Sequence, residues 1–277
     1  MKPSVRKLVM LLLLLVVAAA AYSLWSLRDV VFIKYRSFEQ TRDLLLPHLR
    51  IMQPKTAGRH PAILYFHGCG GPRESRAWRA QEAVDRGFVA IIFDSYTGRE
   101  IKWERTCNGE RMPGFQRAGD VFVALDIARK MPSVDPDQLF LTGYSHGAWT
   151  ILEALALGDN LPRGLKDSPG HHLDGVRGLI AWYPYCGMAA QYSSGLQTHI
   201  PVLMLLAQED RITPPQPCIN FANSEQEKGY PLEWYVYPGV DHGFDLQEDW
   251  VRVYDPEVHA QSVAAEMKFL DKWRTDR

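Results

Sequence analysis

One serine stands where a nucleophile is expected. Ser145 lies between Gly143 and Gly147 in the stretch "LFLTGYSHGAWTILEALAL". The residues before it are apolar or β-branched and predict a buried strand, whereas those after it repeat at helical spacing. Glycine on each side lets the strand and the helix come close, and the tight turn holds the serine hydroxyl at the start of the helix. This context predicts a nucleophilic serine, with an ordinary turn serine as the alternative.

Two later residues supply what a nucleophilic serine needs. Asp210 follows the apolar run "IPVLMLLAQ", and His242 follows "LEWYVYP" in the loop "GVDHGFD". A serine hydroxyl is a weak nucleophile at neutral pH until a base takes its proton. An imidazole accepts that proton and returns it to the leaving group, while a carboxylate on its other nitrogen fixes the tautomer. Ser145, Asp210 and His242 are therefore the predicted catalytic residues, with Glu209 as the alternative acid.

The glycine-rich stretch "HGCGG", residues 67–71, follows the apolar run "PAILYF". Attack on a carbonyl group creates an oxyanion, which two preorganised N–H donors stabilise. We expect the backbone N–H of His146, directly after the serine, to be one donor. We expect the backbone N–H of Cys69 to be the other. His67 is expected to order this loop rather than to act as a base.

Predicted strands and helices alternate along the chain. Further strands are expected at "LRIM", "FVAIIFDSY" and "VRGLIAWYPY". Helices are expected at residues 75–87, 117–131, 217–229 and 259–273. Short apolar runs between helices imply a mostly parallel sheet covered on both faces. Catalytic groups gather at the carboxyl ends of such strands, and the order serine, acid, histidine is the one that α/β-hydrolases use.

Six segments resemble the dienelactone hydrolase family of α/β-hydrolases. They are "YFHGCGG", "FDSY", "RAGDVFVALD", "LTGYSHG", "LLAQEDRITPP" and "YPGVDHGFD", in that order from about Leu49 to the C-terminus. The resemblance implies an eight-stranded, mostly parallel α/β-hydrolase sheet in a single-domain enzyme without a large lid. The founding members of the family use a cysteine nucleophile, whereas this chain has Ser145 at that position.

A serine variant of this family is expected to cleave a carboxylic ester or lactone through an acyl-enzyme intermediate. The expected partner is thus a small-molecule ester or lactone. Two alternatives stay open, namely a peptidase of the prolyl-oligopeptidase type and a non-catalytic, membrane-tethered binding protein. The formal net charge of −1 argues against a nucleic-acid partner. The cysteines and histidines form no metal-like cluster, so neither a metal nor a cofactor is expected.

The chain opens with an apolar segment at residues 8–27 that is long enough to span a bilayer. The alanines at 18–21 offer a signal-peptidase site as an alternative, but the apolar character continues beyond them, so we favour an uncleaved anchor. Three cations precede the segment and four follow it, so the charges leave its orientation open. The predicted division is a signal-anchor or signal peptide at 1–27, a linker and first strand region at 28–48, and a catalytic domain at 49–277.

The four cysteines fit an exported protein. An even number behind an export-like segment suggests disulfides and a periplasmic or other extracytoplasmic compartment, with buried free thiols as the alternative. In the sheet order of an α/β-hydrolase, the strands that end at "HGCGG" and "FDSY" are neighbours, as are those that end at "WYPYC" and "LLAQED". Pairing Cys69 with Cys107 and Cys186 with Cys218 therefore requires the least distortion.

Three further expectations concern polar residues outside the predicted catalytic set. The loop from 96 to 116 is expected to wall the pocket. His171 and His172 are expected in a solvated loop because they lie in a polar stretch that contains glycine and proline. Arg117 and Asp120 are expected to form pairs within the fold and are given no catalytic part.

Overall fold

A seven-stranded sheet forms the centre of the computed structural model, which describes residues 3–73, 77–246 and 253–275. Its order is β1-β3-β2-β4-β5-β6-β7; β1 is antiparallel to β3, and all other neighbours are parallel. The strands are β1 (Arg50–Met52), β2 (His60–Phe66), β3 (Val89–Phe93), β4 (Val134–Tyr144), β5 (Val176–Trp182), β6 (Val202–Ala207) and β7 (Leu232–Tyr237).

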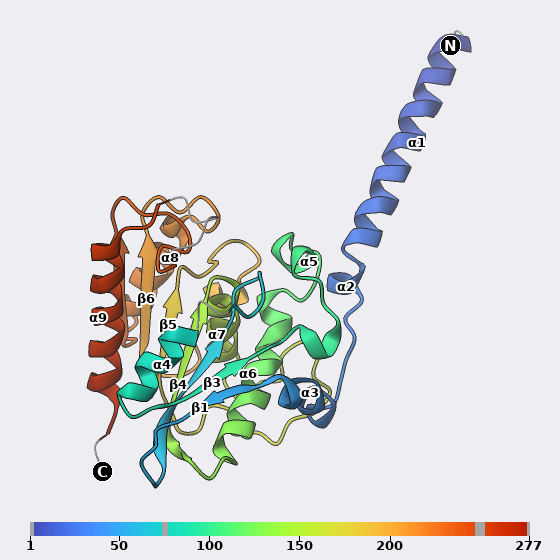
Figure 1. Cartoon of the computed structure of the whole chain (residues 1–277). Helices are drawn as coiled ribbons and strands as arrows, with labels where there is room; N and C mark the ends of the chain where they lie inside the picture. The colour runs from blue at the N-terminus through green and yellow to red at the C-terminus, as the bar shows by residue number, and fades with distance from the viewer. Residues whose placement is uncertain (1–2, 74–76, 247–252, 276–277) are drawn as a thin grey trace.

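Helices cover both faces of this sheet (Figure 1). The longer ones in the domain are α3 (Phe38–Leu45), α4 (Ala77–Asp85), α6 (Gly114–Arg129), α7 (His146–Leu157), α8 (Pro215–Glu227) and α9 (Pro256–Trp273). The apolar side chains of α6, α7 and α8 join one core cluster, and those of α4 and α9 join the other. Because both faces are covered, the central strands are continuous apolar runs rather than alternating ones. The predicted α/β-hydrolase fold class is confirmed.

The start of the domain differs from the prediction. Residues 28–48, where a first strand was expected, form α2 (Arg28–Val31), α3 and the 3₁₀ helix η1 (Leu46–His48). A capping box on Ser37 and Gln40 starts α3, so the local sequence favours a helix there. Extended pairing in this region is limited to one bridge between Arg36 and Leu165. The described residues therefore contain seven strands where the family resemblance implied eight.

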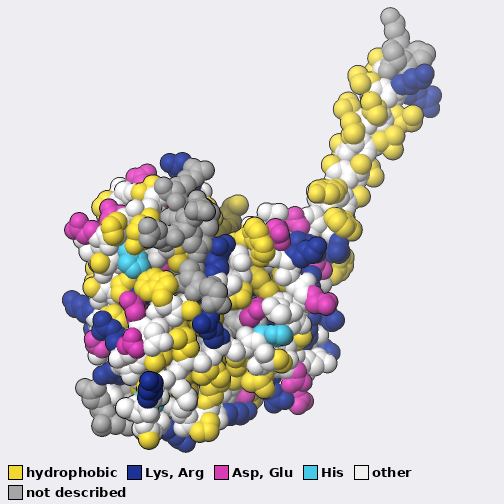
Figure 2. All heavy atoms as spheres, in the orientation of Figure 1, with side chains coloured by type: hydrophobic (Ala, Val, Ile, Leu, Met, Phe, Trp, Pro, Cys, Tyr) yellow, Lys and Arg dark blue, Asp and Glu magenta, His cyan; other side chains and the backbone are white. Residues whose placement is uncertain are grey.

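The helix α1 (Pro3–Ser26) projects away from the domain (Figure 1). Its residues 5–26 are long and apolar enough to cross a membrane, and none of this stretch is buried. Figure 2 shows its apolar side chains exposed along the rod, with cationic side chains near the outer end. A core helix of the same composition would be covered, so the exposure fits an anchor or a signal sequence.

Two disulfides fasten the loops at the carboxyl ends of the strands. Cys69, after β2, is bonded to Cys107 at the end of the short helix α5 (Trp103–Cys107), with Cα atoms 5.0 Å apart. Cys186, after β5, is bonded to Cys218 in α8, with Cα atoms 5.1 Å apart. This is the connectivity that was expected from the neighbouring strand ends.

Candidate active site

Ser145 occupies the sharp turn between β4 and α7. Its backbone has φ +52° and ψ −113°, a conformation that non-glycine residues rarely adopt and that active sites often hold. The two flanking glycines make this turn possible. A Cβ at Gly143 would lie 2.5 Å from the carbonyl oxygen of Gly147, and one at Gly147 would overlap the carbonyl of Phe66. The strand and the helix thus meet as closely as the sequence motif predicted.

His242 lies in the loop after β7, within hydrogen-bond distance of Ser145. Its Nε2 is 2.9 Å from the Ser145 Oγ, and its Nδ1 is 2.7 Å from the Asp210 Oδ2. A carboxylate only accepts, so Nδ1 carries the proton and Nε2 faces the serine as an acceptor. Strand ends that are far apart in the sequence bring these three side chains together in the order that a proton relay requires.

The carboxylate that contacts His242 belongs to Asp210. Its Oδ1 accepts hydrogen bonds from the backbone N–H groups of Ile212 and Thr213, at 2.9 and 2.7 Å, and its Oδ2 accepts one from the Thr213 hydroxyl. These donors fix the carboxylate in place. The neighbouring Glu209, the alternative acid, is exposed.

A cavity of about 280 Å³ opens beside the Ser145 hydroxyl. Gly68 and Cys69 are among its lining residues, and the first residue of α7 is His146, whose amide belongs to the unsatisfied start of a helix. The remaining wall is mostly apolar and includes Trp103, Tyr183, Ile212 and Leu246. Trp103 and Cys107 come from the 96–116 loop, which walls the pocket as expected.

The family model of the dienelactone hydrolases matches residues 48–273. The chain belongs to the dienelactone hydrolase family. This membership covers the whole sheet domain and supports a hydrolase. The resemblance that the six sequence segments carried is thus confirmed.

Solved structures with the same fold include esterases and dienelactone hydrolases. A proposed dienelactone hydrolase from Klebsiella pneumoniae subsp. pneumoniae MGH 78578 is 18% identical, with 81% of this chain and 92% of that chain covered and a TM-score of 0.64. Thermogutta terrifontis esterase 2, phosphoramylated by tabun, is 17% identical, with 83% and 91% covered and a TM-score of 0.60. At these identities the likeness shows the fold alone.

One curated relative matches over a shorter stretch. Dipeptidyl-peptidase 5 of Porphyromonas gingivalis is 29% identical over 101 residues. These residues make up 34% of this chain and 14% of that relative, so the chain spans a small part of its length.

Arg117 lies beside the candidate active site, a position that the sequence did not indicate. It is fully buried in α6 and donates hydrogen bonds to the Ser95 hydroxyl at 2.9 Å and to the His67 carbonyl at 2.7 Å. Its third contact is the His146 Nδ1 at 3.2 Å. Arg117 thus ties the glycine-rich loop to the residue after Ser145. Asp120 pairs with Arg99, so both residues of the "RAGD" segment have partners within the fold, as expected, although not each other.

The two imidazoles that contact Arg117 are held neutral. The Ser95 N–H donates to Nε2 of His67, whose Nδ1–H in turn donates to the Gly68 carbonyl at 2.7 Å. Burial, and secondarily the Arg117 charge, lowers the pKa of His67 well below its ordinary range. The same two causes lower the pKa of His146 to about 3. His67 orders its loop, as expected. Both of its ring nitrogens are occupied by backbone hydrogen bonds, so neither is free to act as a base.

Tyr183 is a buried residue that lines the cavity beside His242. Its ring lies 4.6 Å from the His242 ring, and its hydroxyl donates a 2.5 Å hydrogen bond to Asp245. Its backbone has φ +38°, which again marks a constrained position at a strand end. Trp182 beside it is fully buried in the core. Tyr183 therefore packs against His242 from the cavity wall.

The paired histidines of the polar stretch differ from each other. The His171 side chain is 82% exposed, as a solvated loop requires. His172, in contrast, is buried and stacks on Phe122 with ring centroids 4.0 Å apart, so its expected exposure was wrong. An aromatic partner on α6 covers it, which the polar local sequence does not indicate. Among the described residues no group of histidine, cysteine and acidic side chains is arranged to hold a metal ion.

Proposed function

We propose that this protein is a serine hydrolase that cleaves a carboxylic ester or lactone through an acyl-enzyme intermediate. The observation that carries the proposal is the hydrogen-bonded series from Ser145 through His242 to Asp210, at 2.9 and 2.7 Å. Ser145 is the proposed nucleophile, and His242 is the proposed general base and acid. Asp210 orients the imidazole and stabilises its charged form.

In the proposed first step, the Ser145 Oγ bonds to the substrate carbonyl carbon while its proton passes to Nε2 of His242. The carbonyl electrons move onto oxygen, which receives hydrogen bonds from the backbone N–H groups of Cys69 and His146. The bond to the leaving oxygen then breaks, and His242 returns the proton to that oxygen. Water repeats these steps on the acyl-enzyme, which releases the acid and restores Ser145. Water is the co-reactant, so the sequence of steps calls for no cofactor.

A fluorophosphonate probe tests this proposal directly on the full chain in detergent. Esterase 2 of Thermogutta terrifontis was solved phosphoramylated by tabun, an adduct of the same chemical type. We expect one label per chain, mapped by peptide mass to Ser145, and no label in Ser145→Ala or in heat-denatured protein. A folded protein that takes up no probe would be the non-catalytic binding scaffold instead.

A peptidase is the second candidate, because the short match to Dipeptidyl-peptidase 5 favours it. The same three residues would attack an amide, so the probe does not separate the two activities. Rates on p-nitrophenyl butyrate and on dipeptide p-nitroanilides do. We expect the ester to be hydrolysed and the anilides to be left uncleaved. The cavity wall is mostly apolar, and the described residues contain no second domain that could hold a peptide.

We further propose that α1 remains attached as an anchor and that the domain lies in an extracytoplasmic, periplasmic compartment. The exposed apolar helix and the two disulfides support this location. The protein should then sediment with membranes and resist extraction by carbonate. Recovery of a soluble form that starts near Tyr22 would point to a cleaved signal and a secreted protein.

A further inference from the structure

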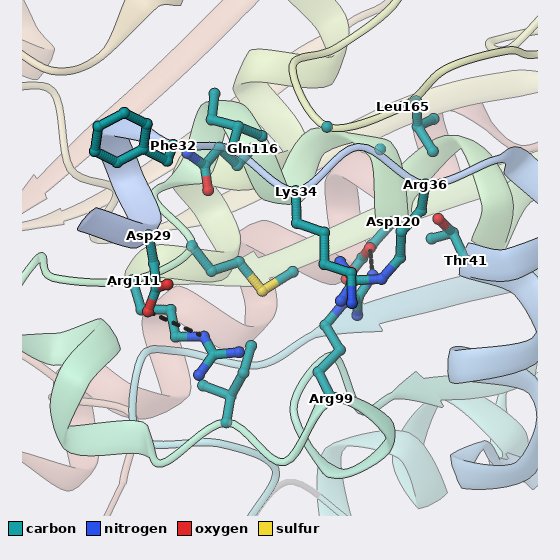
Figure 3. Close-up of a pocket in the computed structure, with 15 residues that line it drawn as sticks. Asp29, Phe32, Lys34, Arg36, Thr41, Arg99, Arg111, Gln116, Asp120 and Leu165 are labelled. Atoms are coloured by element: carbon teal, nitrogen blue, oxygen red, sulfur yellow. Dashed lines mark hydrogen bonds and ion pairs between the residues drawn. The ribbon is translucent and has the colours of Figure 1, made fainter. Parts of the chain in front are cut away.

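A second cavity, of about 140 Å³, lies where the segment after α1 meets the domain. We call it the junction cavity. It shares no lining residue with the cavity at Ser145. Its charged lining comes from three places along the chain: the linker, the loops around 99 and 111, and the helix α6 (Figure 3). The charged lining residues are Asp29, Lys34, Arg36, Arg99, Arg111 and Asp120.

Both carboxylates of the junction cavity are already paired. Arg99 donates to Asp120 through two nitrogens, at 2.6 and 3.1 Å, and the two side chains are 7% and 2% exposed. Asp29 accepts from Arg105 at 2.9 Å and lies 3.9 Å from Arg111. With four cationic and two anionic side chains in the lining, the cavity carries two positive charges in excess.

Lys34 and Arg36 hold that excess. In the described part of the chain neither side chain has an ion-pair partner. Figure 3 shows both converging on Arg99 beside Asp120. The Arg36 backbone is fixed, because its N–H donates to the Gly164 carbonyl at 2.9 Å and its carbonyl accepts from Lys166 at 2.8 Å.

The surroundings of Arg36 disfavour its positive charge. Burial, with the nearby Arg99 next, lowers the pKa of the Arg36 guanidinium, although an arginine in a protein keeps its proton. Asp120 opposes this effect, but it is already paired with Arg99, so the lining keeps a net positive charge around the half-buried Arg36. An anionic ligand would relieve this repulsion and would meet donors from several directions.

We propose that the junction cavity binds a phosphate group, presented either by a phospholipid headgroup or by a soluble phosphate ester. A phosphate monoester carries close to two negative charges at neutral pH, which matches the excess of the lining, whereas a carboxylate carries one. Guanidinium forks and an ammonium group are the donors that proteins use for phosphate oxygens. The cavity includes residues that directly follow the membrane-length helix, so a lipid phosphate is within its reach.

The test uses the full chain in dodecyl maltoside micelles. One arm titrates inorganic phosphate against chloride at equal ionic strength, and the other adds phosphatidic acid or phosphatidylcholine to the micelles. Affinity is measured by calorimetry and by the shift in unfolding temperature, since a ligand of the folded state raises it. The test variant is Lys34→Gln with Arg36→Gln. The matched control is Lys55→Gln with Arg59→Gln, two exposed cations on the turn between β1 and β2.

We expect phosphate or phosphatidic acid to stabilise the wild type and the control, and the test variant to bind about tenfold more weakly or worse, because two charged donors are lost. A response to phosphatidic acid alone assigns the site to a lipid headgroup, and a response to inorganic phosphate assigns it to a soluble ester. Lys34 is exposed, so Lys34→Gln alone should fold normally. This single variant should still bind more weakly than the wild type. Equal binding by test and control variants, or no response in either arm, would overturn the proposal. These readouts do not involve turnover, so they are independent of the proposed hydrolase activity.

Discussion

The Ser145 cavity and the junction cavity use buried arginine in opposite ways. Beside the Ser145 cavity, Arg117 donates to three fixed acceptors, and the imidazoles around it are kept neutral. In the junction cavity, one arginine is paired with Asp120, whereas Lys34 and Arg36 form no ion pair among the described residues and leave the lining net positive. The first arrangement satisfies its arginine with neutral acceptors, whereas the second leaves a lining with two more cations than anions.

This difference separates two tasks. Stabilising charge that develops during a reaction requires donors that are already in place, so that little reorganisation accompanies the step. Binding a stable anion instead requires charge that is left unmatched until the ligand arrives. If the Ser145 cavity acts through such preorganised groups, substitutions there should lower the rate most at the groups that contact the substrate.

Replacing the proposed nucleophile should have the largest effect. Ser145→Ala is expected to lower kcat for p-nitrophenyl butyrate by about 10⁴-fold or more, since the covalent step is lost. Its unfolding temperature should stay close to that of the wild type. Ser194→Ala, at an exposed serine of the η4 turn (Gln191–Ser194), is the matched control and should keep full activity. A Ser145→Ala enzyme with most of its rate would remove the chemistry from this cavity.

The acid should rank next. Asp210→Asn is expected to lower kcat by roughly 10³- to 10⁴-fold, because an amide in place of the carboxylate favours the wrong tautomer of His242. Glu209→Gln changes the adjacent, exposed acid by the same atoms and should leave kcat unchanged. Steady-state rates of the two variants at one pH decide the point. Similar losses in both would mean that the choice between these acids is wrong.

The two disulfides should have equal effects on stability and unequal effects on rate. The two bridges join cysteines that are 38 and 32 positions apart in the sequence. Because the closed loops are of similar length, losing either bridge is expected to lower the free energy of unfolding by about 3–4 kcal/mol. Cys69→Ser with Cys107→Ser should also lower kcat by about tenfold at temperatures below melting, since Cys69 supplies a proposed oxyanion donor.

Cys186→Ser with Cys218→Ser is the matched control for this comparison. It removes a bridge of similar span that does not line the Ser145 cavity. Denaturant unfolding and kcat are measured for both pairs. If both double variants kept the wild-type kcat, the 69–107 bridge would be purely structural.

The smallest expected effect is a pH dependence of stability. The folded pKa of His146, about 3, lies below its ordinary value of 6.5, so the folded protein resists protonation that the unfolded chain accepts. Its contribution is fully present above pH 6.5 and is lost as the pH falls toward 3. Between pH 7 and pH 5 the loss is about 2 kcal/mol. The lowered pKa of His67 acts in the same direction.

Denaturant unfolding at pH 7 and pH 5 measures this effect. His146→Gln should flatten the dependence, whereas His171→Gln, at a side chain that is 82% exposed, should leave it as in the wild type. Equal slopes in all three proteins would show that the imidazole beside Arg117 titrates normally. The Ser145 cavity would then lack the neutral surroundings that distinguish it from the junction cavity.

Much of the site could be predicted because local sequence encodes it. Glycines two residues to either side of Ser145 specify the turn, and apolar runs specify the strands whose ends carry Asp210 and His242. The sheet order that the family resemblance implied then led to the two cysteine pairs. These features depend on periodicity and on turn residues, which neighbouring positions in the sequence determine.

The tertiary structure alone decided which buried charges meet. The sequence of α6 offers Arg117 and Asp120 one helical turn apart, yet the fold sends Arg117 to the glycine-rich loop and Asp120 to Arg99. Arg36, in the linker before α3, likewise lines the same cavity as Arg99, which lies 63 positions further along the chain. A charged side chain pairs with a group on whichever segment the packing brings near. Leaving a buried charge without such a partner destabilises the fold. No spacing along the chain encodes such contacts.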